Sequence, residues 1–224
     1  MLFFRKKYSS ALNLEISGLL LEHPVGLLYN GKKLKIQRPR PSFLTLYPPQ
    51  GEEILPWIVG LRAQYKEMLL AVNINTDIVR SFSLVYDFAD LIIVDPAAPG
   101  GNGTPDVSDI TDLMDELLSL RLCYERYTPI FVRIPAGLEP AEIHPLLDYC
   151  RLSGIDGIVV PGVQKLLQAR AYTQERLPMI ASVESFDDAL QLASDRIPVE
   201  TRLFSPLLRQ KLLKTLEKQV SNHA

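Results

Sequence analysis

Short apolar strands alternate with amphipathic helices along most of this chain, and that alternation restricts the fold more than any other feature. Residues 90–122 show the unit most clearly. Leu91–Val94 is a short apolar run rich in β-branched side chains, which is typical of a strand buried on both faces. A loop with three glycines and three prolines follows, and residues 107–122 then carry apolar side chains at helical spacing, with Ser108 or Asp109 as the predicted N-cap.

The same unit recurs in both directions along the chain. The patterns predict strands at 24–29, 34–37, 69–74, 91–94, 129–134, 157–160, 178–181 and 197–201, and helices at 52–66, 77–86, 107–122, 139–152, 163–171, 185–193 and 207–220. This order predicts a (β/α)8 TIM barrel of the α/β class, formed by residues 1–224 as a single domain. An alternating segment at 12–21 predicts an N-terminal β-hairpin that closes the floor. No helix fits between Tyr29 and Leu34, so the first helix is expected to be missing.

Bulk composition excludes several classes of function. The formal charge is 24 − 26 = −2 with no long basic run, so nothing favours nucleic acid or an anionic membrane surface. No apolar stretch approaches the ~20 residues of a membrane span, and the amino terminus lacks the pattern of a signal peptide. The two cysteines have no thiol or histidine at ligand spacing, so no metal site is predicted. We therefore expect a cytoplasmic protein.

Six segments in order add a family resemblance. They are His23–Leu27, Arg38–Pro41, Val72–Ile74, Tyr86–Pro99, Val132–Leu138 and Gly154–Val160. Together they resemble dihydroorotate dehydrogenase, the FMN-dependent barrel enzyme of pyrimidine biosynthesis, over most of the chain. The resemblance implies a barrel with FMN and the substrate at the carboxyl ends of the strands.

The family's substrate-handling residues match this sequence poorly. The position of the proton-abstracting base matches Ala98, whose methyl group cannot accept a proton. A substrate-binding asparagine matches Asp95, a flavin-contacting lysine matches Arg133, and a further asparagine matches Gly162. Only Asn73 is retained. The resemblance therefore implies an oxidoreductase family but an incomplete active site.

The phosphate-binding end of the family pattern is also altered. The turns after the seventh and eighth strands lack the glycines that allow close backbone approach to a phosphate. Glu184 and Glu200 add negative charge there, which Arg202 offsets in part, and the first loop is expected to be only Leu28–Lys32. The sequence thus predicts no cofactor, with FMN retained only if the chain is an active enzyme.

Other charged residues have structural explanations as well as functional ones. Asp95 and Arg133 follow neighbouring strands, so we expect an ion pair inside the barrel mouth. Arg38 and Arg40 are candidates for binding a small anion, although loop arginines are usually solvated. His23 lies at the start of a strand, the end of a barrel that supports stability rather than catalysis.

Three hypotheses are open at this stage. The first is a catalytically inactive relative, a pseudoenzyme kept as a binding, regulatory or partner subunit. The second is an active FMN-dependent dihydroorotate dehydrogenase with replaced site residues, and the third is different small-anion chemistry at the barrel mouth. Combined losses at the base, flavin and phosphate positions favour the first. A missing first helix would expose apolar strand surface, so a homo-oligomer or a related barrel subunit is expected as partner.

Overall fold

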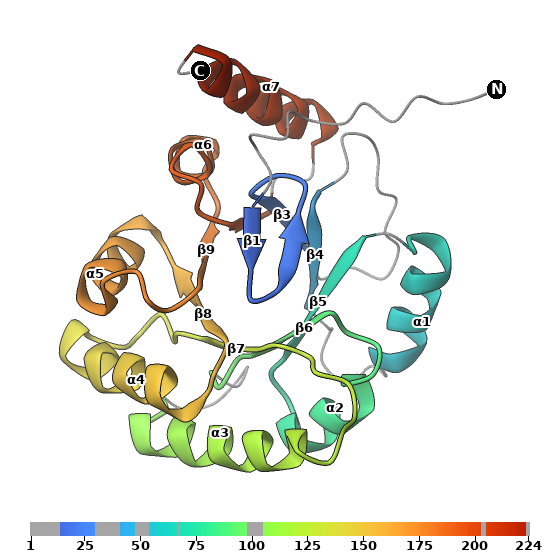
Figure 1. Ribbon diagram of the computed structural model, residues 1–224, viewed down its shortest axis with the longest axis vertical. Helices are drawn as coiled ribbons and strands as arrows, with labels where there is room; N and C mark the ends of the chain where they lie inside the picture. Colours follow the sequence, from blue (N-terminus) through green and yellow to red (C-terminus); the bar gives the residue numbers. More distant parts are fainter. Residues whose placement is uncertain are drawn as a thin grey trace.

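Eight parallel strands close into a barrel in the computed structural model, which describes residues 14–29, 41–47, 54–66, 68–97, 105–202 and 205–222 (Figure 1). Around the barrel the order is β10-β3-β4-β5-β6-β7-β8-β9. Their bounds are β3 Val25–Tyr29, β4 Phe43–Leu46, β5 Leu69–Ile74, β6 Leu91–Val94, β7 Ile130–Arg133, β8 Gly157–Pro161, β9 Met179–Val183 and β10 Val199–Thr201. The predicted TIM barrel is confirmed.

Seven helices of the described residues form the outer ring, one after each strand from β4 to β10 (Figure 1). They are α1 Ile54–Gln64, α2 Ile78–Val85, α3 Val107–Arg121, α4 Pro140–Ser153, α5 Val163–Thr173, α6 Phe186–Ser194 and α7 Pro206–Asn222. Within the described part of the chain no helix follows β3. The N-cap of α3 is Asp106, not Ser108 or Asp109, because the backbone is already helical from Val107. No helix in the described ranges is long and apolar enough to cross a membrane.

The second barrel strand is not where the sequence pattern placed it. β4 pairs with β3 through Leu27↔Leu44, and residues 34–37, the predicted strand, lie outside the described residues. A strand of a parallel barrel is apolar on both faces, as Phe43–Leu46 is, whereas residues 34–37 alternate apolar with polar.

This shift corrects two further expectations. The connection between β3 and β4 runs through 13 residues, 30–42, so the first loop is not a short turn at Leu28–Lys32. Arg38 and Arg40 precede the second strand in the chain rather than following its carboxyl end, and both lie outside the described residues.

The outward faces of β3 and β4 are covered, contrary to the prediction of an exposed apolar gap. The outward side chains of these strands are Val25, Leu27, Leu44 and Leu46, and each is at most 2 % exposed. They belong to the same core cluster as Ile58 of α1 and Leu212 of α7. These four side chains therefore offer no exposed apolar surface at β3 and β4.

Inside the barrel, the strand register places side chains in layers. Neighbouring strands are staggered, and side chains alternate in and out, so alternate strands share each level. At the floor, Phe43, Leu91 and Gly157 face inward. Above them the inward layers are Gly26, Ala71, Phe131 and Ile180; then Thr45, Ile93, Val159 and Glu200; then Leu28, Asn73, Arg133 and Ser182. The two lowest layers are apolar, and polar groups begin in the layer of Thr45 and Glu200.

The floor is closed by the predicted hairpin, β1 Leu14–Ile16 and β2 Leu19–Leu21 (Figure 1). Its Ile16 and Leu21 share a buried cluster with Phe43 and Phe131 of the barrel interior. His23 is buried beside it, and its Nδ1 accepts a hydrogen bond from the Val25 amide at 3.2 Å. This bond ties the imidazole to the start of β3.

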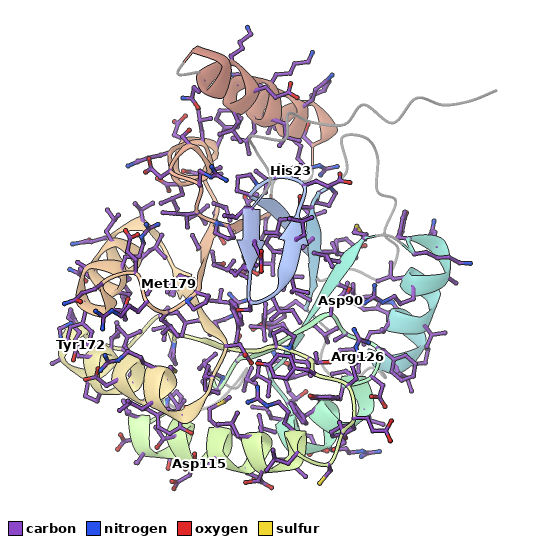
Figure 2. All side chains as sticks on the ribbon, viewed as in Figure 1. His23, Asp90, Asp115, Arg126, Tyr172 and Met179 are labelled. Carbon is purple, nitrogen blue, oxygen red and sulfur yellow. The ribbon has the colours of Figure 1, made fainter. Side chains whose placement is uncertain are left out.

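Two aspartates fasten the amino-terminal ends of the strands. Asp90 accepts a hydrogen bond from the Leu70 amide at 2.8 Å and pairs with Arg62. It also pairs with Arg126 (Figure 2). Asp156 accepts one from the first amide of β7 at 2.8 Å and pairs with Arg121. Both carboxylates bond backbone amides of a neighbouring strand, so these charges tie adjacent strands of the barrel together.

Candidate functional site

The carboxyl ends of five strands bring a cluster of polar side chains together inside the barrel mouth. Asn73 lies in β5, Arg133 ends β7, and Glu200 lies in β10. Tyr47 and Asp95 directly follow β4 and β6. We call these five residues the mouth cluster. Catalytic and ligand-binding residues of TIM barrels occupy this end, so the mouth cluster is the candidate site.

Arg133 is the centre of the mouth cluster. Its Nη1 donates to Glu200 Oε1 at 2.7 Å, and its Nε donates to Asn73 Oδ1 at 3.1 Å. The same Nε lies 3.5 Å from Asp95 Oδ2, which is the predicted ion pair. Burial lowers the pKa of Arg133, but the charges of Glu200 and Asp95 more than offset this and raise it above its ordinary value. The guanidinium is therefore held as a cation between two carboxylates.

Asp95 is held from a second side by Tyr47. The Tyr47 hydroxyl donates to Asp95 Oδ2 at 2.6 Å, and the Ala97 amide approaches Oδ1 at 3.2 Å. Burial, together with the hydrogen bond to Asp95 and its charge, raises the pKa of Tyr47 to about 12. Tyr47 is thus a neutral donor that fixes the carboxylate.

The titration of Tyr47 gives the first prediction. Because the folded state raises its pKa from 10.0 to about 12, this tyrosine contributes stability that is complete below pH 10 and is lost as the pH rises towards 12. We expect the difference between tyrosinate absorbance titrations of the wild type and Tyr47→Phe to show one group ionising near pH 12. A difference curve centred near pH 10 would show that the hydroxyl is solvated.

The sequence predicts part of the mouth cluster but not all of it. Asp95 and Arg133 were predicted to meet because they end neighbouring strands. Glu200 was assigned to a phosphate-binding turn, yet it is fully buried and is the closest partner of Arg133. Side chains alternate in direction along a strand, and Val199 and Thr201 of β10 face outward. This alternation predicts that Glu200, between them, faces the barrel interior. Tyr47 was missed because the second strand was misplaced.

The turns at the predicted phosphate end are acidic. Arg202 Nη1 lies 3.5 Å from Glu184 Oε1, and both side chains are mostly exposed. The helix that follows, α6, carries Asp187 and Asp188 in its first turn, and the Asp188 amide donates to the hydroxyl of Ser185 at 3.0 Å. One amide of this helix terminus is therefore already bonded, and the first turn carries two acidic residues.

Of the other predicted site residues, one lies in the described part of the chain and three lie outside it. Gly162 precedes α5 and has a φ of 75°. This backbone conformation favours glycine, so the residue needs no ligand to explain it. Ala98, the position of the family base, lies outside the described residues, as Arg38 and Arg40 do. The described ranges contain no group of three or more His, Cys, Asp or Glu side chains placed to hold a metal ion.

Comparison with known proteins gives a likeness of structure but not of sequence. No protein-family model matches the chain, and no curated protein sequence matches it. Two solved structures of DHODH from Eimeria tenella are similar. The complex with ferulenol has a TM-score of 0.73 at 14% identity, covering 99% of this chain and 86% of that one. The ligand-free DHODH has a TM-score of 0.71 at 14% identity, covering 99% and 90%. The fold is a DHODH-like barrel.

Proposed function

We propose that this chain is a catalytically inactive DHODH-like barrel, serving as a binding, regulatory or partner subunit, and that it does not hold FMN. One observation carries the proposal. Arg133 stands where the resemblance places a flavin-contacting lysine, and its Nε and Nη1 already donate to Asn73 and Glu200 inside the barrel. A flavin ring would have to compete with a buried ion pair for that guanidinium.

The charge of the mouth cluster also disfavours the substrate of the resembled enzyme. Two buried carboxylates, Asp95 and Glu200, face one guanidinium. An incoming carboxylate such as that of dihydroorotate would meet an excess of negative charge at short range, where the low local dielectric strengthens repulsion. This supports loss of the original substrate site.

FMN itself fits the described residues poorly at its phosphate end. A phosphate favours a helix terminus with free amides and no acidic side chains. Glu184 precedes α6, Asp187 and Asp188 lie in its first turn, and the Ser185 hydroxyl accepts from one of its amides. Arg202 is the offsetting cation, and it is paired with Glu184.

An active FMN-dependent DHODH is the second candidate, and the fold likeness together with the retained Asn73 favours it. Calorimetric titration of FMN into the purified protein separates the two functions. We expect no binding with a Kd at or below ~1 μM, which corresponds to about −8 kcal/mol.

A matched variant makes that experiment more informative. The double variant Arg133→Lys with Glu200→Gln introduces the lysine of the resembled family at position 133 and removes the carboxylate that pairs with Arg133. Weak FMN binding that improves in this variant would locate the block at the mouth cluster. Tight binding to the wild type, followed by bleaching of the flavin on addition of dihydroorotate, would restore the enzyme hypothesis.

A further inference from the structure

Four polar atoms inside the barrel are shielded from solvent and have no hydrogen-bond partner among the described residues. They are Thr45 Oγ1, Asn73 Nδ2, Arg133 Nη2 and Glu200 Oε2. By strand register, Thr45 and Glu200 share one inward layer, and Asn73 and Arg133 share the layer directly above. The four atoms therefore come from two adjacent levels of the same interior.

These atoms are linked by the bonds that their residues already make. Arg133 joins Asn73 through Nε and Glu200 through Nη1, at 3.1 and 2.7 Å. Each of the three side chains thus has one end fixed and one end unpaired. Buried polar groups in folded proteins are nearly always paired, with protein or with ordered water.

Hydrogen-bond capacity and charge together identify the missing partner. The amide of Asn73, the guanidinium of Arg133 and the hydroxyl of Thr45 offer donors, while Glu200 Oε2 offers an acceptor. Donors predominate, which by itself would suit an anion. Two carboxylates, Asp95 and Glu200, already outnumber the one guanidinium, so an added anion would be repelled. The partner must be neutral, small, and able both to donate and to accept.

We propose that the barrel interior holds a buried water site that bridges β4, β5, β7 and β10 through Thr45, Asn73, Arg133 and Glu200. A bridging water donates to Glu200 Oε2 and accepts from Arg133 Nη2 or Asn73 Nδ2. This water completes the hydrogen bonding of the Arg133–Glu200 pair. The mouth cluster and the water together fill the barrel interior above the apolar floor. This site is distinct from a pocket for an anionic ligand.

High-resolution crystallography of the full chain, with and without a bromide soak, tests the proposal. We expect at least one ordered water within hydrogen-bond distance of two or more of the four atoms, and no anomalous bromide signal there. In Thr45→Val, which keeps the side-chain shape, the water contacting that position should be lost or displaced. Thr111→Val, at a threonine that bonds the Ser108 carbonyl on the surface of α3, is the control and should leave it unchanged.

Three outcomes would overturn the proposal. The first is the absence of any water contacting two of these atoms. The second is a rearrangement in which the four atoms bond one another directly. The third is a bromide peak beside Arg133, which would show that the site takes an anion.

Discussion

Arg133→Met is expected to destabilise the protein by about 3–5 kcal/mol, the range for breaking a buried ion pair on one side. The substitution leaves Glu200, which is fully buried, without its closest partner at 2.7 Å. It also leaves Asn73 and Asp95 without a guanidinium that each now contacts. Chemical denaturation followed by circular dichroism measures the change in the free energy of unfolding.

Replacing both Arg133 and Glu200 should lower the free energy of unfolding less than replacing one of them alone. Arg133→Met with Glu200→Leu replaces both charges by apolar groups, and such replacements are often close to neutral. We expect the double variant to be more stable than the sum of the two single effects predicts. Arg151→Met is the control, because Arg151 pairs with Asp148 at 3.3 Å on the surface and should cost at most about 1 kcal/mol. Additive effects of the two buried substitutions would contradict the coupling.

Much of the fold could be predicted because its signals are local. The third strand was predicted at 69–74 and β5 is Leu69–Ile74; a fourth strand was predicted at 91–94 and β6 is Leu91–Val94. Both are apolar runs bounded by turn residues. The second strand failed because an Asn-Gly turn signal at residues 30–31 favoured an early strand, and local pattern gives no measure of burial on both faces.

The candidate site was harder to predict because its contacts cross the barrel. Asp95 and Arg133 end adjacent strands, so chain order alone brings them together. Glu200 reaches Arg133 from β10, which is three strands away from β7 around the ring. That contact depends on strand register and on closure of the barrel, and neither can be obtained from periodicity. The family resemblance places Glu200 in a phosphate-binding turn, whereas the closed barrel turns it into the interior.

Gly157→Ala is expected to destabilise the protein by about 3 kcal/mol, at the upper end for overpacking a core. A Cβ at this position would lie 2.4 Å from Cζ of Phe131 and under 3 Å from two further ring atoms. That ring is fully buried among Val159, Ile180 and the hairpin, so it has little room to move. The shift in the midpoint of denaturation, at unchanged slope, measures the effect.

Two variants separate steric overlap from a general effect of replacing glycine. Gly60 lies inside α1, and a Cβ there has no heavy atom within 4 Å, so Gly60→Ala should stabilise by about 0.5–1 kcal/mol through helix propensity. Phe131→Leu removes the atoms that Gly157→Ala would strike, so the double variant should be more stable than the sum of the single effects. If Gly157→Ala were tolerated, or if Phe131→Leu gave no compensation, the close approach of the ring to β8 would not be what requires glycine there.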